Sequence, residues 1–161
     1  MKKRVFLIAL CMMLLTSMVL APISASASVV RIMKVNVNGA RLRTGPGESS
    51  ILKPSLKKGE RVFYWGKHAN AFYYVRTSTG RVGYVYKRYL TSYGAVNSSQ
   101  IYYAAGKVNV YKKTSTGARR VTKLSNRQHV IVYEARGGWA YIKTLSGKGG
   151  YVKMSSLRKA K

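Results

Sequence analysis

A duplicated segment constrains the fold of this chain more than any other feature of its sequence. Residues 76–85, Arg-Thr-Ser-Thr-Gly-Arg-Val-Gly-Tyr-Val, are matched by residues 143–152, Lys-Thr-Leu-Ser-Gly-Lys-Gly-Gly-Tyr-Val. Each copy has the pattern of a strand, a glycine turn and a returning strand, because Gly80 and Gly147 can adopt positive φ without steric cost. The sequence therefore predicts the same β-hairpin twice.

The match extends outward on both sides of the hairpin. Leu90 corresponds to Leu157 at a separation of 67 positions, and Leu42 corresponds to Val110 at 68. A nearly constant separation over so long a stretch indicates that a whole structural unit is duplicated. We therefore predict an all-β chain of two small domains. The expected boundaries are a signal peptide at 1–27, a first domain at 28–92, a linker at 93–100, and a second domain with a basic tail at 101–161.

The N-terminal segment has the composition of an export signal. Basic residues 2–4 precede an apolar run at 5–20, and residues 25–27, Ala-Ser-Ala, are the small residues that signal peptidase accepts. We expect cleavage after Ala27, which would remove the only cysteine, Cys11. An uncleaved membrane anchor is the alternative, because the run approaches the roughly 18 residues that span a bilayer.

The charge of the chain is strongly unbalanced. It has 30 Lys and Arg residues against 3 acidic residues, for a formal net charge of +27. Such an imbalance predicts a polyanionic environment, and the candidates are nucleic acid, anionic lipid or the phosphate-rich polymers of a bacterial wall. A surface kept cationic for solubility is the alternative, although such surfaces do not usually dispense with acidic residues.

Three short motifs of the first repeat occur in a familiar order. They are Leu-Arg-Thr-Gly-Pro-Gly at 42–47, Leu-Lys-Lys-Gly-Glu-Arg-Val at 56–62 and Gly-x-x-Gly-Tyr-Val at 80–85. This set resembles the bacterial SH3 domain (SH3b). The second repeat departs from the pattern at 111–114, Tyr-Lys-Lys-Thr, where the Arg-x-Gly-Pro signature is absent. The resemblance implies two small SH3-like β-barrels in tandem, and commonly a role in attaching exported proteins to peptidoglycan peptides of the cell wall.

An enzymatic function is not expected. No cysteine nucleophile would survive cleavage of the signal, and Glu48, Glu60 and Glu134 are the only carboxylate side chains. We interpret all three as surface groups. His68 and His129 occupy non-equivalent positions in the two repeats, and neither has an acidic or thiol cluster to complete a metal site. We therefore predict no catalytic residues, no cofactor and no metal.

Ligand binding is expected to use aromatic rings in excess of what two small cores bury. Strand alternation places Phe63, Trp65 and Tyr73 away from the Val62 and Tyr64 face, although both faces of a strand can be partly buried in a thin barrel. Rings beside arginines would form a platform for a peptide or sugar backbone, with cations for its carboxylates or phosphates. The candidate ligand-binding residues are Arg41, Arg43, Phe63, Trp65, Tyr73, Tyr84, Tyr133, Trp139 and Tyr151.

These features predict a secreted, cell-wall-associated binding module without catalytic activity. Its expected partners are peptidoglycan peptides or a teichoic-acid-like polyanion, and two weak modules on a short linker would gain residence through effective concentration. Two alternatives remain open. One is a module that binds the peptide of a partner protein in the envelope. The other is a nucleic-acid-binding protein, suggested by basic residues interleaved with aromatic ones but disfavoured by export.

Overall fold

The computed structural model describes residues 28–160, and these form two antiparallel sheets of seven strands each. The predicted signal peptide lies outside the described residues. Within residues 28–160, no helix is long and apolar enough to cross a membrane. The first sheet consists of β1 (Val29–Val35), β2 (Ala40–Arg43), β3 (Leu52–Leu56), β4 (Arg61–Ala69), β5 (Phe72–Thr77), β6 (Val82–Tyr86) and β7 (Leu90–Asn97).

The second sheet repeats the first strand by strand. It consists of β8 (Ile101–Ala104), β9 (Val108–Tyr111), β10 (Arg120–Leu124), β11 (His129–Arg136), β12 (Trp139–Thr144), β13 (Gly149–Lys153) and β14 (Leu157–Lys159). Short 3-10 turns, η1 (Lys87–Tyr89), η2 (Ser98–Gln100) and η3 (Met154–Ser156), separate some of the strands.

The strand order confirms the duplication. The first sheet runs β3-β2-β6-β5-β4-β1-β7 and the second β10-β9-β13-β12-β11-β8-β14, so each strand occupies the position of its counterpart. Each sheet also keeps two edge strands, β3 and β7 in the first and β10 and β14 in the second. The all-β, SH3-like tandem is confirmed, whereas the hydrogen bonds of neither sheet close it into a barrel.

The duplicated hairpin has the geometry that its sequence predicts. Gly80 and Gly147 have φ values of 86° and 93°, in the region that favours glycine. The hydroxyl of buried Thr77 accepts a hydrogen bond from the backbone N–H of Arg81 at 3.1 Å, and in the second repeat Thr144 accepts one from Lys148 at 3.0 Å. The same turn is therefore stabilised in the same way twice.

The glycine of each Gly-Tyr-Val motif is required by a close approach between strands. A Cβ on Gly83 would lie 2.5 Å from the carbonyl oxygen of Arg43, and one on Gly150 would lie 2.6 Å from that of Tyr111. These carbonyl groups belong to the ends of β2 and β9. The motif is therefore conserved between the repeats because the backbone of a neighbouring strand occupies the space of a side chain.

Each repeat buries a hydrophobic core of its own. Aliphatic side chains dominate both cores, and Tyr64 is the one ring among the buried residues of the first. The first core comprises Met33, Val35, Ala40, Leu42, Leu56, Val62, Tyr64, Val75, Val85 and Leu90. The second comprises Ala104, Val110, Leu124, Val130, Val132, Ala140, Ile142, Val152 and Leu157.

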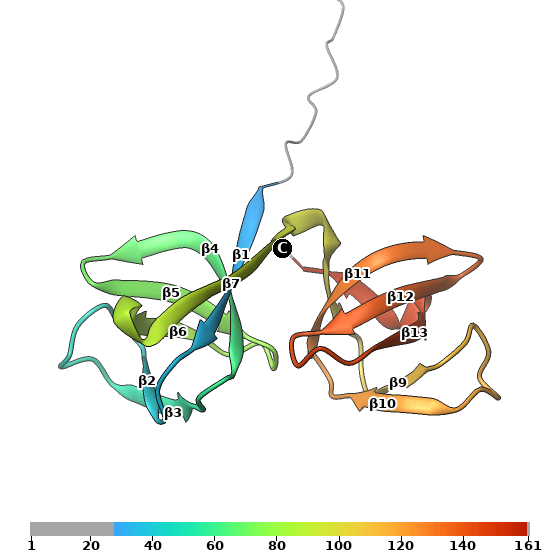
Figure 1. Cartoon of the computed structure of the whole chain (residues 1–161), viewed down its shortest axis with the longest axis horizontal. Helices are drawn as coiled ribbons and strands as arrows, with labels where there is room; N and C mark the ends of the chain where they lie inside the picture. Colours follow the sequence, from blue (N-terminus) through green and yellow to red (C-terminus); the bar gives the residue numbers. More distant parts are fainter. Residues whose placement is uncertain (1–27, 161) are drawn as a thin grey trace, which may run out of the picture.

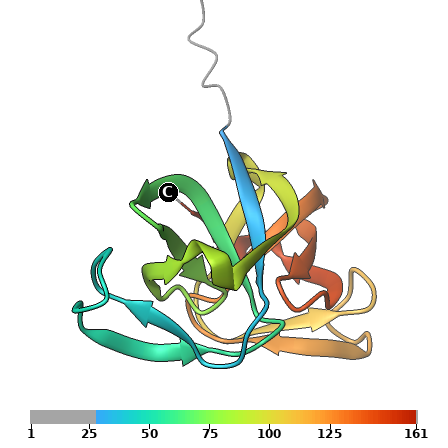
Figure 2. The ribbon, with the colours of Figure 1, turned by 60° about the vertical axis from the view of Figure 1, so that its left-hand side comes forward.

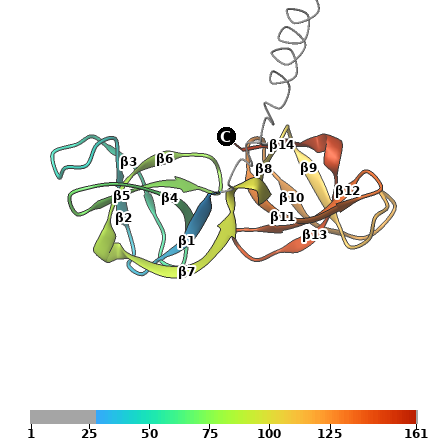
Figure 3. The ribbon, with the colours of Figure 1, turned by 90° about the horizontal axis from the view of Figure 1, so that it is seen from above.

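A third hydrophobic cluster joins the two repeats. The views in Figures 1 and 3 show the repeats side by side, with the C-terminal end of the chain close to the junction. At this junction the first repeat buries apolar residues of β1 and β4 against β8, β11 and the hairpin turn of the second. The cluster, called here the interdomain core, consists of Val30, Ile32, Phe63, Ile101, Ile131 and Leu145.

The segment at 93–100, predicted to be a linker, is ordered as part of the first sheet. β7 continues to Asn97, which pairs with Val29 of β1, and the backbone N–H of Ser98 donates to the carbonyl of Ser28 at 2.8 Å. The η2 turn then leads directly into β8. Residues 93–97 of the predicted short linker therefore belong to the first sheet, and the interdomain core joins the two repeats.

Candidate ligand-binding grooves

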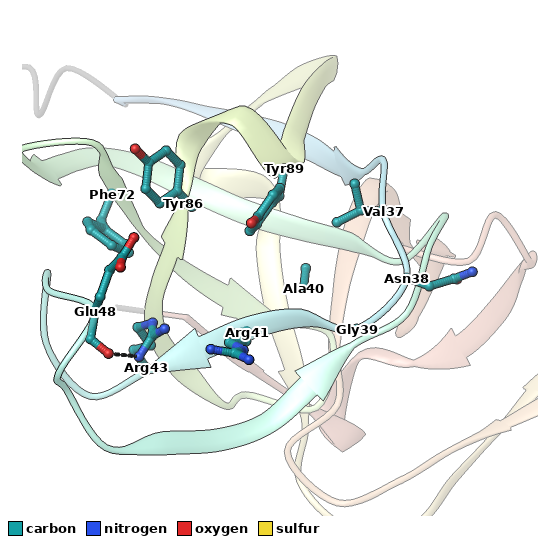
Figure 4. Close-up of a pocket in the computed structure, with 10 residues that line it drawn as sticks. All are labelled: Val37, Asn38, Gly39, Ala40, Arg41, Arg43, Glu48, Phe72, Tyr86 and Tyr89. Atoms are coloured by element: carbon teal, nitrogen blue, oxygen red, sulfur yellow. Dashed lines mark hydrogen bonds between the residues drawn. The ribbon is translucent and has the colours of Figure 1, made fainter.

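The first repeat carries a groove of about 500 Å³ floored by aromatic rings (Figure 4). The ring of Phe72 meets Tyr86 edge-on with centroids 5.0 Å apart, and Tyr86 lies 5.7 Å from Tyr89. Arg41 contributes an exposed cation from β2, on the other side of the groove. We call this the first groove.

Arg43 supports the loop at the end of the first groove. Its Nη1 donates to the backbone carbonyls of Glu48 and, at 3.2 Å, of Ser50, and only 7% of the residue is exposed. The Arg-Thr-Gly-Pro signature thus fixes the loop at 44–50 and directs the Glu48 side chain toward Phe72 (Figure 4). Arg43 was predicted to offer its charge to a ligand, but burial and these two bonds give it a structural role.

The second repeat has a groove of a different design. Trp139, Tyr141 and Tyr151 line it together with Glu134 and Arg136, in a volume of about 300 Å³. Tyr141 and Tyr151 meet edge-on with centroids 5.2 Å apart. We call this the second groove.

Tyr111 explains how the second groove forms without the arginine signature. It occupies the position of Arg43 in the duplicated unit, and its ring meets Trp139 edge-on at 6.1 Å. An aromatic contact therefore replaces the loop-holding guanidinium of the first repeat. The strand pairs β2–β3 and β9–β10, which carry these positions, extend along the same side of the molecule (Figures 1 and 2).

Each groove contains one of the three glutamates of the chain. Glu48 lines the first groove and Glu134 the second, and both are exposed. Each carboxylate lies in a groove that also holds an arginine, Arg41 or Arg136, and several rings. Such a groove can accept an ammonium group, a carboxylate and an apolar backbone of one ligand at the same time.

The nine candidate residues do not converge on one site. Trp139 and Tyr151 share the second groove, and Arg41 and Arg43 lie in the first. The remaining rings are elsewhere: Tyr73 stacks on Tyr64 at 4.3 Å, Tyr84 contacts Tyr74 at 5.0 Å, and Phe63, Trp65 and Tyr133 lie in or beside the interdomain contact.

The structure corrects the prediction that the ring of Phe63 is available to a ligand. Strand alternation correctly places it opposite Val62, but its ring has no exposed surface, because the second repeat covers that face. Trp65 is half-buried against the same cluster, and the guanidinium of Arg76 lies 5.0 Å from its ring centroid. Tyr133, its counterpart, is 50% exposed, with Lys143 Nζ 5.2 Å from its ring.

Several groove residues were not among the candidates. They are Phe72, Tyr86, Tyr89, Arg136 and Tyr141, together with Glu48 and Glu134, which were interpreted as surface carboxylates. The alignment of the repeats held one usable signal, since Phe72 and Trp139 are large rings at equivalent positions. No such signal marked Glu48 and Glu134, because they occupy non-equivalent positions in the two repeats. They reach the grooves only in the folded chain.

No group of three or more His, Cys, Asp or Glu side chains within residues 28–160 is arranged to hold a metal ion. The two aromatic grooves lie instead on a tandem of SH3-like sheets. A family model described as "Bacterial SH3 domain" matches residues 38–91 and 106–158. The chain belongs to this family, whose domains generally bind cell-wall components and are often extracellular or wall-associated.

NlpC and NlpC/P60 proteins are among the solved structures to which this chain is partly similar. NlpC2 and NlpC1 from Trichomonas vaginalis are 15% and 16% identical, with TM-scores of 0.36, and the match covers 84% and 85% of this chain but 49% and 48% of theirs. An NlpC/P60 family protein from Bacillus cereus ATCC 10987 is 11% identical, with a TM-score of 0.34, over 79% of this chain and 55% of that one. The chain thus spans about half the length of these structures. No significant match to a curated protein sequence was found.

Proposed function

We propose that this protein is an exported binding module that attaches to the bacterial cell wall through its two aromatic grooves. The observation that carries the proposal is that each repeat, in a chain with only three acidic residues, combines rings, one exposed arginine and one glutamate in a groove. Wall peptides carry free amino and carboxylate groups on a short backbone. The rings would contact that backbone, and the two charged groups would orient it.

The cationic surface would act before the grooves do. The whole chain has a net charge of +27, and removal of Lys2, Lys3 and Arg4 with the predicted signal peptide leaves +24 on the exported chain. This charge attracts anionic wall polymer over roughly a Debye length, about 8 Å at physiological salt, and so raises the local concentration of protein at the wall. This attraction is screened as salt rises, whereas ring contacts in a groove are screened far less. The two contributions can therefore be separated by salt.

The fixed junction between the repeats changes how two sites would cooperate. With the repeats packed through the interdomain core, the distance between the grooves is set by the fold and not by a flexible linker. Joint binding therefore requires wall sites at a matching spacing, and where the spacing matches, little conformational entropy is lost on binding the second site.

The test is sedimentation of the purified protein with isolated cell-wall sacculi, with and without wall teichoic acid, from about 50 to 500 mM salt. We expect a salt-sensitive fraction that disappears with the polymer and a fraction that persists at high salt. Binding that vanishes completely once polymer is removed, at every salt concentration, would refute groove recognition of peptidoglycan.

Substitutions of aromatic residues in the two grooves test whether the grooves account for the binding that persists at high salt. Trp139→Ala and Tyr86→Ala should each reduce high-salt binding by about tenfold, since a ring contact of this kind contributes roughly 1–3 kcal/mol. Tyr93→Ala is the matched control, because Tyr93 is an exposed ring that lines neither groove. Equal losses in all three variants would mean that the grooves are not the binding sites.

A further inference from the structure

A pocket of about 340 Å³ at the junction of the repeats lies apart from both grooves. Arg76 and Gly80 of the first repeat form one wall of it. The other wall belongs to the second repeat, which contributes Tyr103, Arg127, His129, Lys159 and Ala160. Three cationic side chains from two domains therefore meet at one pocket, called here the junction pocket.

His129 forms a neutral floor beneath these cations. It is 5% exposed, and Nη1 of Arg76 donates to its Nε2 at 3.4 Å, which places the ring proton on Nδ1. Burial, together with Arg76 and Arg127, lowers the pKa of His129 from 6.5 to about 4, so the ring is uncharged at neutral pH. A weak interaction of the ring with the backbone of Arg127 partly offsets this lowering of the pKa, and the buried Nδ1 has no partner at good hydrogen-bond geometry within residues 28–160.

No glutamate compensates the positive charge of the junction pocket. Glu48 and Glu134 line the two grooves, and the carboxylate of Glu60 accepts a hydrogen bond from the backbone N–H of Lys57 at 3.1 Å. Cations held together without an anionic partner repel one another, and a bound anion relieves that cost.

Backbone conformation at Arg127 adds a second cost. Its φ is 60°, in the left-handed region that favours glycine or asparagine over a long side chain. Strained residues of this kind concentrate where a side chain must be held for binding. In the turn before β11 the guanidinium of Arg127 lies 6.0 Å from the centroid of the Tyr103 ring and lines the pocket.

We propose that the junction pocket binds a phosphate group, either as free phosphate or as the phosphodiester of a linear polymer. Two guanidinium groups and an ammonium group can supply several charge-assisted hydrogen bonds to the oxygens of one tetrahedral anion. The site is built from both repeats, so binding would also brace the interdomain contact. This proposal does not depend on recognition of wall peptides by the grooves.

The two histidines of the chain provide the test. His ring resonances of the purified protein are followed by NMR at pH 7 while inorganic phosphate is added, with chloride at matched ionic strength as the reference. His129 should shift and saturate, and its pKa should rise because a bound anion offsets Arg76 and Arg127. His68 is exposed, lies outside the pocket, and should follow the chloride reference. Equal, non-saturating shifts of both residues would overturn the proposal.

Charge-matched variants separate the pocket from the general cationic surface. Arg127→Asn removes one charge at a position whose backbone favours Asn, so folding is preserved, and it should weaken phosphate binding by about tenfold. Arg119→Asn removes the same charge from an exposed loop of the second repeat and should change binding by less than about twofold. Equal effects of the two variants would show ionic attraction without a site.

A short glycerol phosphate oligomer identifies the source of the phosphate. Tighter saturation of His129 by the oligomer than by inorganic phosphate would assign the pocket to a polymer, and the reverse would assign it to free phosphate. Both outcomes support a phosphate site. Failure of both probes to saturate His129 would refute it, and the result with sacculi at high salt would still stand by itself.

Discussion

The two sides of the interdomain contact occupy equivalent places in the duplicated unit but are chemically different. On one side Arg61 extends toward the turn at Gly147, and on the other His129, its counterpart, contacts the turn at Gly80. Nη1 of Arg61 donates to the carbonyl of Leu145 at 2.9 Å. On the other side the crossing is made by the backbone N–H of His129, which donates to the carbonyl of Ser78 at 2.7 Å.

The difference decides which cations are engaged. The guanidinium of Arg61 is held by the Leu145 carbonyl and by the Tyr93 ring, whose centroid is 3.9 Å from Cζ. Where histidine replaces this arginine, the crossing no longer uses a charged side chain, and Arg76 and Arg127 are left around a neutral ring. A pocket of about 290 Å³ also lies on the Arg61 side, where Arg61 and Lys143 line it. The substitution between copies therefore changes how the cations are engaged and not whether a pocket is present.

The largest effect on stability should come from a substitution in the interdomain core, to which both repeats contribute. Phe63→Ala should lower the free energy of unfolding by about 3–5 kcal/mol, because it opens a cavity in the fully buried interdomain core. Urea unfolding followed by tryptophan fluorescence measures the change. Tyr133→Ala, at a half-exposed ring on the rim, is the control and should cost less than about 1 kcal/mol. A similar small cost for Phe63→Ala would show that the repeats do not depend on this contact.

The acid sensitivity of the fold should come in part from the pocket side. The pKa of His129 is lowered to about 4 in the folded protein, so the unfolded chain takes up a proton first as pH falls. The contribution of neutral His129 to the free energy of unfolding should be fully present above about pH 6.5. It should fall toward pH 4 by an amount on the order of 1–3 kcal/mol, allowing for partial solvent screening. Arg76, Arg127 and Lys159 line the pocket together with this ring.

Two histidine variants test whether His129 causes this loss of stability at low pH. His129→Gln should remove this part of the pH dependence in denaturant titrations between pH 4 and 7, whereas His68→Gln, at an exposed position, should retain it. The three glutamates are unchanged in both variants, so their titration cancels in the comparison. An unchanged pH profile in His129→Gln would show that the buried imidazole does not titrate with unfolding.

Substitutions of Arg61 and Arg76 compare the two sides of the interdomain contact directly. Arg61→Gln should cost about 1–3 kcal/mol of stability, since it leaves the Leu145 carbonyl without its donor. Arg76→Gln should cost less, about 0.5–1 kcal/mol for its long 3.4 Å hydrogen bond to Nε2 of His129, and should weaken phosphate binding. The pair is measured by urea unfolding and by the His129 titration. Reversed results, with Arg76 needed for stability and Arg61 for phosphate, would invert the assignment of the two sides.

Lys143 should show the smallest effect. It is the counterpart of Arg76 on the Arg61 side, where it lines a pocket, and its ammonium group lies over the half-exposed ring of Tyr133. Lys143→Gln should change stability by less than about 0.5 kcal/mol and leave phosphate binding within about twofold of the parent. A large loss of phosphate binding would indicate that a second anion site operates at the Arg61 side.

Local features of the sites were only partly predictable from the sequence. Trp139 and Tyr151 were chosen as isolated rings, and the structure brings them into one groove because β12 and β13 are adjacent in the sheet. Arg43 was chosen for its charge, but its position at the end of β2 turns the guanidinium back onto its own loop. Glu48 and Glu134 acquire a place beside rings only when their loops fold over the strands.

The sequence by itself determined the duplication, the hairpins and the glycines of this protein, because these depend on local backbone conformation. Positive φ at Gly80 and Gly147, and the alternation of Val62 and Phe63, follow from neighbouring residues alone. Only the tertiary structure decided that the Phe63 face is covered. Alternation defines two faces of a strand without saying what lies against each, and here the second repeat buries one of them and creates the junction pocket at its edge.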